Sequence, residues 1–373
     1  MRDQAMDATR SVSHFGIIAA NMPFFAIPGG YGLSWWLQGS VFADIAAVVF
    51  IRALCEGPFI GLFTLLFGFG IAQQLDRYGR VFVFKRAALL GVLGLFHGLL
   101  LFAGDILLGY ALCAAVYVLL RPRIRNVPAA IVAGISLSVL GLFAISALQF
   151  LIELPRPTGD SLLAVMQSGD ALAMLMLNVQ GWIGFYVAMP LHLFFFIFGS
   201  FVVGAWIYER WGNLSDAVET LGPWQNVLWS VGFLGSGTYS ILMLLGQIQQ
   251  IPALEFLASP LRPLFGFVLM LPLLRIIYLI MNGNLENPIV RVFIRTGRAS
   301  LSLYVSQSLI GVAVFHGLGL FAAFSMWQVL AFSFVILVAL QLAMAMWLMT
   351  FSDGPLEMVM KSRPTRKSEP SKA

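Results

Sequence analysis

Long apolar runs, separated by short polar or basic stretches, extend along the chain to about residue 351. The runs are continuously apolar. This favours membrane-spanning helices over barrel strands, whose apolar and polar residues alternate. The pattern predicts an all-α polytopic membrane protein with about ten transmembrane helices. The predicted spans are 12–28, 57–76, 82–103, 105–120, 127–151, 187–208, 225–246, 263–282, 299–317 and 327–351.

Between and within these spans, two local patterns predict further structure. The segment 28–54 carries Trp35, Trp36 and Asp44 and is too polar at its start to span, so it is expected at the outer interface or as a re-entrant piece. In the second span, small residues recur at spacings of four, three and four residues, which predicts a stripe for close helix packing. The stripe consists of Gly57, Gly61, Thr64 and Gly68.

The composition agrees with a single transmembrane domain, assigned to residues 1–356. The chain of 373 residues is 60% hydrophobic and only 10% charged, with a mean hydropathy of +0.89. No soluble domain needs so much apolar surface. Residues 357–373 form a basic tail rich in Pro and Ser, which is expected to be disordered and cytoplasmic.

The basic residues fall mainly on one side of the predicted spans. With these spans, 18 of the 22 lysines and arginines share the side of the two termini. Positively charged loops mark the cytoplasmic side, so both termini are predicted inside and the number of spans even. The net charge of +5 is therefore interpreted as a topology signal, and no nucleic-acid partner is expected.

The stretch from Lys85 to Tyr110 contains the first candidate chemistry. Arg86 and His97 are 11 residues apart, which places them on one helix face with roughly 16 Å between them along the axis. An ionisable group inside the membrane is costly and favours a functional role. Asp105 is interpreted either as the N-cap of the next helix or as a partner that orients His97. A straight helix separates the two by roughly 12 Å, so a direct contact needs a bend or a re-entrant turn.

Two further spans carry polar residues on one face. Arg10 and Asn21 repeat the 11-residue spacing in the first span, and His14 is expected near the interface. In the ninth span, Arg298 precedes a face that either lines a polar cavity or forms interhelical hydrogen bonds. This face contains Ser300, Tyr304 and Gln307. The four histidines are scattered at different predicted depths, so no metal site is predicted.

Several short motifs together resemble the YeiB-like family of bacterial cytoplasmic-membrane proteins, a family of unknown function. The resemblance covers essentially the whole chain and implies a multi-pass protein of the bacterial inner membrane. It is carried by the segments DATR with Asn21 and Pro28, EGPFIGLFTLLFGFG, KR…H…GDIL…YAL, GR…S…Y…QS, GLG and GPLE at 354–357.

This family looks like a branch of the transmembrane acyltransferase superfamily, whose members transfer acyl groups from coenzyme A thioesters. The superfamily motif is a basic residue, ten residues and a histidine in the first span. Arg10 fits this motif, but position 21 is asparagine. Arg86 and His97 have the same spacing two helices later. Gln307 stands where a histidine is often found, and GPLE lacks the tryptophan and arginine that commonly follow.

The first functional hypothesis is therefore an acyl-coenzyme A-dependent acyltransferase acting on a hydroxyl or amine. Arg10, Arg86 and Arg298 would bind the coenzyme A phosphates. His97 would act as base with help from Asp105, while an oxyanion would be stabilised by Asn21, Tyr304 or Gln307.

A small-molecule transporter or exporter is the alternative, and a membrane scaffold or sensor ranks third. The expected partners are the lipid bilayer, an unidentified small-molecule acceptor and, as an open option, a second copy in a homodimer.

Overall fold

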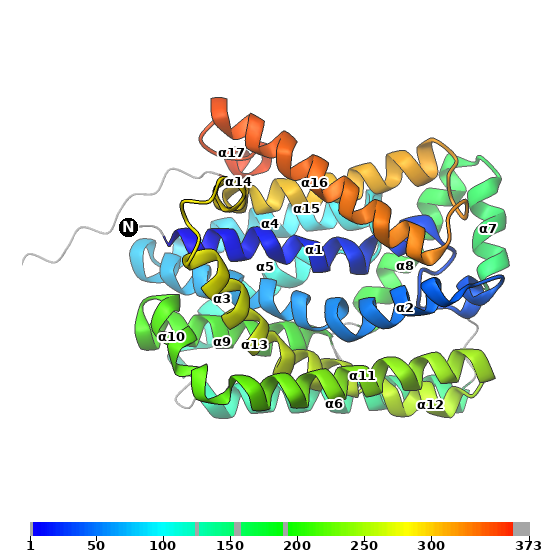
Figure 1. Ribbon diagram of the computed structural model, residues 1–373, viewed down its shortest axis with the longest axis horizontal. Helices are drawn as coiled ribbons and strands as arrows, with labels where there is room; N and C mark the ends of the chain where they lie inside the picture. Colours follow the sequence, from blue (N-terminus) through cyan, green and yellow to red (C-terminus); the bar gives the residue numbers. More distant parts are fainter. Residues whose placement is uncertain (1–2, 124–126, 153–157, 189–192, 361–373) are drawn as a thin grey trace, which may run out of the picture.

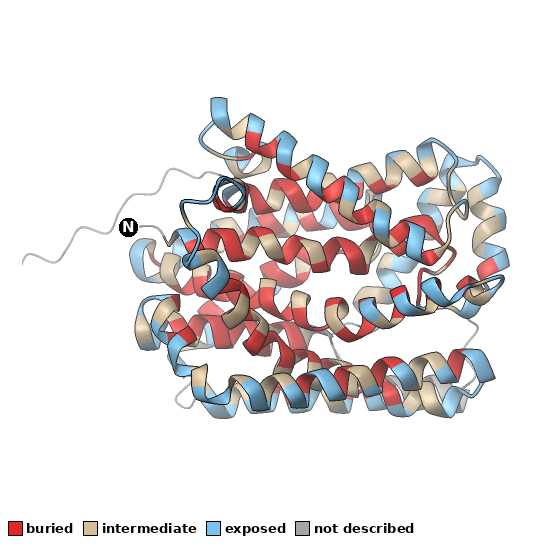
Figure 2. Ribbon diagram, viewed as in Figure 1, coloured by how far each residue is buried: buried red, intermediate tan, exposed pale blue. Residues whose placement is uncertain are grey.

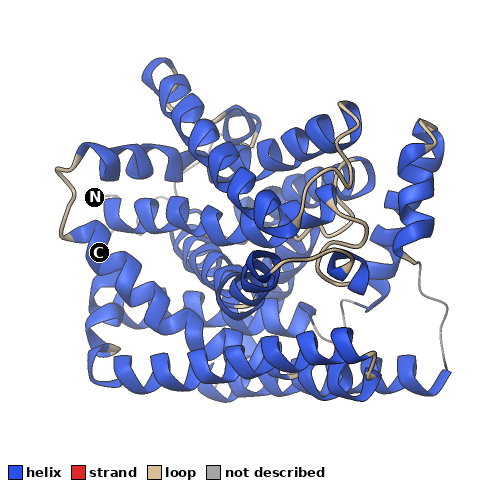
Figure 3. Cartoon of the chain, turned by 45° about the vertical axis from the view of Figure 1, so that its right-hand side comes forward, coloured by secondary structure: helices blue, strands red, loops and turns tan. Residues whose placement is uncertain are grey.

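The computed structural model describes residues 3–123, 127–152, 158–188 and 193–360, and every element in this part of the chain is helical (Figure 3). The long helices are α1 Gln4–Ala26, α3 Pro58–Tyr78, α4 Arg80–Leu100, α5 Leu107–Leu120, α6 Val127–Ile152, α8 Ala171–Ala188, α9 Leu193–Trp211, α11 Gln225–Gln249, α13 Leu261–Asn282, α15 Ser300–Gly311 and α16 Met326–Thr350.

Shorter helical elements connect or extend the long helices. They are η1 Ser34–Leu37, α2 Phe42–Phe50, the π-helix η2 Ile51–Glu56, η3 Arg121–Arg123, α7 Gly159–Gln167, α10 Leu214–Thr220, η5 Gly222–Trp224, α12 Pro252–Ala258, α14 Pro288–Thr296, η6 Gly297–Ala299, the π-helix η7 Val312–Gly317 and α17 Pro355–Val359.

Seven stretches among the described residues are long and apolar enough to cross a membrane. By length and composition these are Phe42–Tyr78, Arg80–Leu100, Val127–Ala144, Gly222–Gln249, Pro252–Asn282, Pro288–Gly317 and Met326–Thr350. A helix coincides with each of the ten predicted spans, but α1, α5 and α9 are not among the seven stretches. The chain is thus a helical membrane protein with several spans, and the total of ten stays a prediction.

The two described ends of the chain lie at the same end of the bundle. Elements η6 and α17 pack together, and α1 packs against η6 (Figure 1). This end is called the terminal end below. The opposite end carries α7 and the connection between α4 and α5. An even number of spans requires both ends of the chain to lie on one side of the membrane. Which side the terminal end faces stays a prediction.

Helix α1 lies in the middle of the bundle, which explains why so polar a helix can reside there. Seventeen of its 23 residues are buried (Figure 2). The Ser11 hydroxyl is 2.8 Å from the Thr296 hydroxyl, and Gln341 Nε2 donates to Ser11 Oγ at 2.9 Å. Polar groups inside a membrane protein are stable when other helices supply their hydrogen bonds. The helix α1 is therefore surrounded by protein, with little of it left to face lipid.

Peripheral helices expose large apolar side chains on their outward faces (Figure 2). On α16 these include Val335, Leu342 and Met349, and on α11 they include Leu234 and Ile241. In water such surfaces would associate, whereas lipid chains cover them without cost. The outward faces of α11 and α16 thus have the chemistry of a lipid-facing surface.

The segment 28–54 differs from its prediction. Its second half forms α2 and enters η2, which continues into α3, so that Phe42–Tyr78 is one apolar stretch of 37 residues. Asp44 does not interrupt it, because its carboxylate accepts hydrogen bonds from the backbone N–H groups of Val41 and Trp327. The expected interfacial or re-entrant piece is therefore limited to the residues before α2.

The predicted glycine stripe on α3 forms close helix contacts. A Cβ at Gly57 would lie 3.0 Å from the Cα of Gly266, and one at Gly68 would lie 2.1 Å from the Phe201 carbonyl oxygen. On the facing helix, a Cβ at Gly204 would lie 1.8 Å from the Leu65 carbonyl oxygen. Helices α3 and α9 therefore touch through their backbones, and they form the most extensive helix pair of the bundle.

The GPLE segment binds the start of α15. Glu357 Oε1 accepts hydrogen bonds from the backbone N–H groups of Leu301 at 2.7 Å and Ser302 at 3.2 Å. Glu357 Oε2 accepts one from the Ser302 hydroxyl at 2.5 Å. A carboxylate at a helix N-terminus satisfies orphan amides and interacts favourably with the helix dipole. The predicted tail boundary at 357 thus falls inside α17, and residues 361–373 lie outside the described residues.

Replacing Glu357 by alanine is expected to destabilise the protein by about 1–2 kcal/mol, because the first turn of α15 loses its cap. Thermal unfolding of the purified protein in detergent measures this change. The Glu357→Gln variant keeps one carbonyl acceptor and should unfold at an intermediate temperature. Equal unfolding temperatures for the alanine variant and the wild type would contradict the capping role.

Candidate functional site

The connection between α4 and α5 is six residues long and reverses the chain direction. Helix α4 ends at Leu100, and the backbone N–H groups of Leu101 and Phe102 both donate to the His97 carbonyl oxygen, at 2.9 and 3.0 Å. Asp105 N then donates to the Phe102 carbonyl oxygen at 3.0 Å, and α5 begins at Leu107. This compact turn places Asp105 beside the last turn of α4.

His97 and Asp105 form a buried pair. His97 Nδ1 lies 2.8 Å from Asp105 Oδ1, and the two residues are 2% and 0% exposed. The other carboxylate oxygen, Oδ2, accepts a hydrogen bond from Leu108 N at 3.2 Å. Asp105 therefore contacts His97 and also accepts a hydrogen bond from the first turn of α5, although the N-cap residue of that helix is Ile106. The six-residue turn after Leu100 is the bend that a direct contact needs, because a straight helix would separate the two residues by roughly 12 Å.

Three tyrosines surround this pair. The Tyr304 ring lies 5.2 Å from the His97 ring, centroid to centroid, which joins α15 to α4. The Tyr186 hydroxyl donates to the Asp105 carbonyl oxygen at 2.9 Å, and Tyr110 is also close to Asp105. Within the described residues, the second ring nitrogen of His97, Nε2, has no hydrogen-bond partner. An imidazole held at Nδ1 by a carboxylate has Nε2 left for a proton or a substrate.

A cavity of about 1080 Å³ is lined in part by α7 and α8. These helices lie at the end of the bundle opposite the terminal end (Figure 1). The second half of α1, η7 and α6 also contribute to its wall, together with five residues of the 101–106 connection. Apolar side chains predominate in the lining, with a few polar groups such as Asn21, Asn178 and His316. His97 and Asp105 do not line the cavity themselves, whereas the residues on either side of Asp105 in the connection do.

The other predicted site residues occupy three different places. Asn21 lines the cavity. Gln307 is buried beside His14, with its Nε2 3.3 Å from His14 Nδ1. His14 is fully buried by other helices, and its expected depth near the membrane interface stays a prediction. Ser300 lies at the terminal end, where its hydroxyl donates to the Gly297 carbonyl oxygen at 2.9 Å. The expected polar face of the ninth span is thus used for contacts between elements, and its residues do not line the cavity.

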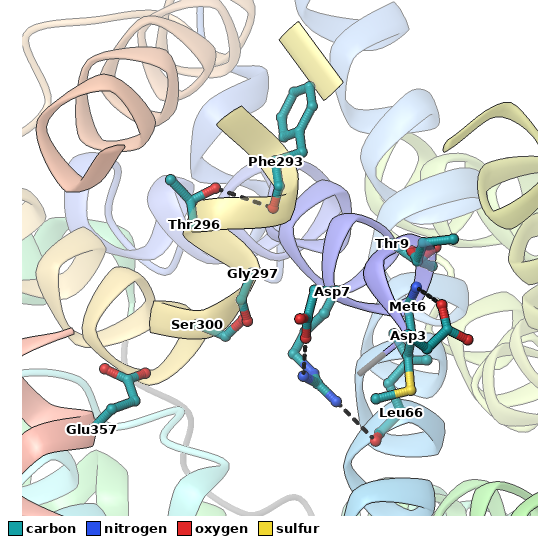
Figure 4. A network of polar contacts seen from close by, with 12 residues as sticks. Asp3, Met6, Asp7, Thr9, Leu66, Phe293, Thr296, Gly297, Ser300 and Glu357 are labelled. Atoms are coloured by element: carbon teal, nitrogen blue, oxygen red, sulfur yellow. Dashed lines mark hydrogen bonds and ion pairs between the residues drawn. The ribbon is translucent and has the colours of Figure 1, made fainter. Parts of the chain in front are cut away.

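The three arginines predicted to bind coenzyme A lie on three elements of the terminal end. Arg10 on α1 contacts the Asp7 carboxylate at 3.3 Å and the Leu66 carbonyl oxygen at 3.5 Å (Figure 4). Arg86 on α4 is partly buried within electrostatic range of Glu357, and Arg298 on η6 is exposed. Arg10 is therefore engaged inside the protein, while Arg298 has the exposure that an incoming phosphate needs.

A second, polar crevice of about 710 Å³ lies between α3, α5 and α9. Arg80, Arg121 and Arg210 line it together with the carboxylates of Asp76 and Glu209. Arg121 forms an ion pair with Glu209. In the sequence these arginines are only topology signals, because juxtamembrane arginines in different loops give no indication that they meet.

A further ion-pair network in the cavity wall was also missed. Arg262 Nη1 donates to Glu56 Oε1 at 2.6 Å, and the Tyr239 hydroxyl donates to Glu56 Oε2 at 3.0 Å. Arg52 lies in the same turn of η2 as Glu56 and is 2% exposed, although the segment 28–54 was expected at the outer interface or as a re-entrant piece. Its partners come from positions far away in the chain, which no local pattern reveals.

The fold and the buried pair define a multi-pass helical membrane protein with a polar centre. Comparison with known proteins supports the similarity of this chain to a YeiB-like family. The model of the family "Protein of unknown function (DUF418)" matches residues 208–366. The uncharacterized protein YeiB of Escherichia coli K12 is 25% identical over an alignment of 405 residues, gaps included. The alignment covers 99% of this chain and 98% of that protein.

The uncharacterized protein YxaH of Bacillus subtilis 168 is similar over a shorter part. It is 34% identical over 128 residues, which are 31% of this chain and 32% of that protein. No solved structure matches the chain.

Proposed function

We propose that the protein is a membrane-embedded acyltransferase that uses His97 as its general base. The observation that supports this is the buried His97–Asp105 pair, in which Asp105 holds Nδ1 while Nε2 has no partner among the described residues. A carboxylate that fixes one imidazole nitrogen orients the ring and stabilises its protonated form during transfer.

The proposed reaction joins an acceptor to the acyl group of a coenzyme A thioester. The acceptor oxygen or nitrogen attacks the thioester carbonyl carbon while its proton passes to His97 Nε2. The carbon–sulfur bond then breaks, and the coenzyme A thiolate takes the proton from His97. Tyr304, whose hydroxyl donates no hydrogen bond to a described residue, is the proposed donor to the oxyanion that forms in between.

The donor is proposed to approach from the terminal end, where the arginines lie. Guanidinium groups match phosphate oxygens in geometry and charge. Arg298 is exposed and Arg86 is partly buried on the helix that carries His97. The apolar cavity on the opposite side of the 101–106 connection suits an acceptor with apolar parts.

Arg86→Ala is expected to weaken the binding of acetyl-coenzyme A about tenfold, because one charge-assisted phosphate contact is lost. Calorimetry on the purified full-length protein measures this affinity, with Arg210→Ala as the matched variant from the polar crevice. Loss of affinity in Arg210→Ala alone would move the phosphate site to that crevice. No binding of acetyl- or palmitoyl-coenzyme A to the stable wild type would remove the acyltransferase proposal.

The cavity also favours a second function, the transport of a small amphiphile. Its volume of about 1080 Å³ exceeds what a catalytic water or a small acceptor needs. Transport would move a labelled amphiphile across vesicles that contain the protein, without any thioester. Movement that persists in the His97→Gln variant would favour the transporter over the enzyme.

A further inference from the structure

Arg52 is a buried cation whose partners are neutral. Its Nη2 donates to the Tyr31 carbonyl oxygen and, at 2.9 Å, to Gln247 Oε1. Gln247 Nε2 donates to the carbonyl oxygens of Tyr31 and Gly32, so its amide oxygen is fixed toward Arg52. Among the described residues, Arg52 Nε and Nη1 have no hydrogen-bond partner. A buried guanidinium in such a place needs a negative charge that this part of the chain does not supply.

The neighbouring ion pair leaves this positive charge uncompensated. Glu56 is shared between Arg262 and the Tyr239 hydroxyl, so its charge balances Arg262. Tyr31 cannot add a negative charge, because burial and the nearby Glu56 raise the pKa of its hydroxyl well above the ordinary value. The cluster of Arg52, Glu56 and Arg262 therefore carries one net positive charge.

This charge lies at the wall of the large cavity. Tyr31, Glu56 and Arg262 line the cavity directly. Arg52 is not in the lining, but its guanidinium lies over the ring of Tyr31, 5.8 Å from the ring centre. In a medium of low dielectric constant, a charge at this depth acts strongly on a group inside the cavity. The rest of the wall is mainly apolar and includes Phe24, Leu142, Leu175, Phe185 and Phe196.

We propose that the cavity binds a single-chain anionic amphiphile, with its carboxylate or phosphate head toward Arg262 and Arg52 and its chain along the apolar wall. The head compensates the net charge of the Arg52, Glu56 and Arg262 cluster, and the chain fills the apolar volume. The inference concerns binding alone and does not depend on acyl transfer, because no thioester takes part in the test.

The test compares dodecanoate, dodecyl phosphate and dodecanol on the full-length protein in phosphatidylcholine nanodiscs. Displacement of a fluorescent dodecanoate gives the three affinities, with empty nanodiscs as the reference for partitioning. The two anions are expected to bind about tenfold more tightly than dodecanol, since they add a charge interaction in a low-dielectric site. Equal affinities for dodecanoate and dodecanol in the wild type would overturn the proposal, whatever the variants do.

Two charge variants locate the head. Arg52→Gln is expected to weaken dodecanoate about tenfold and to leave dodecanol unchanged, whereas Arg52→Lys should keep the preference for the anion. An unchanged preference in a folded Arg52→Gln protein would contradict the role of Arg52. If Arg52→Gln does not fold, the proposal is still tested by the comparison of ligands on the wild type and by the glycine variants of the cavity described below.

Two glycines provide matched variants for the position of the chain. Gly184 on α8 lines the cavity, Gly237 on α11 does not, and a Cβ at either position would meet nothing within 4 Å. Gly184→Leu is expected to weaken dodecanoate binding and Gly237→Leu to leave it unchanged. Equal effects would place the amphiphile on the outer surface and overturn the proposal.

The last comparison separates a free anion from an amphiphile. Acetate and inorganic phosphate should not displace the fluorescent dodecanoate, because they lack the chain that contacts the apolar wall. Displacement by these small anions at the concentration of dodecanoate would identify a simple anion site and overturn the proposed class. Mass spectrometry of protein purified from membranes then distinguishes a fatty acid from a lysophospholipid as the natural source.

Discussion

Acyl transfer is expected to fall by about 10²–10⁴-fold when His97 is replaced by glutamine, because the acceptor loses its general base. Glutamine can still donate a hydrogen bond to Asp105 and so retains the α4–α5 hairpin, but it takes no proton at neutral pH. Release of coenzyme A from acetyl- and palmitoyl-coenzyme A measures the reaction in membranes that contain the protein, where the native acceptor is present.

Stability distinguishes this role from a purely structural one. The His97→Gln variant should unfold close to the wild-type temperature, whereas His97→Ala leaves the buried Asp105 carboxylate without its partner and should cost about 1–3 kcal/mol. If the pair had only a structural role, every variant that folds would keep full acyl-transfer activity. Wild-type rates of coenzyme A release in His97→Gln would therefore exclude His97 as the base.

Gly204→Leu is expected to destabilise the bundle by more than about 3 kcal/mol and to abolish the monodisperse folded protein. Even its Cβ would lie 1.8 Å from the Leu65 carbonyl oxygen, and backbone cannot move aside as a flexible side chain can. Helices α3 and α9 would have to separate along their whole contact. Size-exclusion chromatography and thermal unfolding in detergent measure the effect.

The control for this variant is Gly237→Leu, where a Cβ meets nothing within 4 Å. That substitution should leave the unfolding temperature unchanged or raise it slightly, because leucine is a better helix former than glycine. A Gly204→Leu protein as stable as Gly237→Leu would show that α3 and α9 do not approach through their backbones.

The positions of the long helices and part of the candidate site can be predicted from the sequence. Continuous apolar runs predicted a helix at each of ten places, and the spacing of Gly57, Gly61 and Gly68 predicted a packing stripe that the close approach of α3 to α9 and α13 confirms. Asp105 was expected either as the N-cap of the next helix or as a partner that orients His97, and the sequence did not decide between the two. Their direct contact depends on the turn geometry, which a straight-helix distance cannot represent.

Other contacts could not be predicted because they join distant segments. His14 contacts Gln307, which follows 293 positions later. Arg52 belongs to the segment 28–54, which was expected at the outer interface or as a re-entrant piece, yet it is buried. Its acceptor Gln247 follows 195 positions later, so only the packing of α11 against η2 reveals that the cation is buried.

The position of α1 also determines the order in which this protein can be made. This helix is synthesised before the segments that carry Thr296, Gln307 and Gln341, yet its polar side chains bond to these residues. Until those helices exist, its buried polar residues have no protein partners in the bilayer. The hydrogen bonds of α1 can be completed only after synthesis of α16, because a chain truncated before Met326 would lack Gln341, the partner of Ser11.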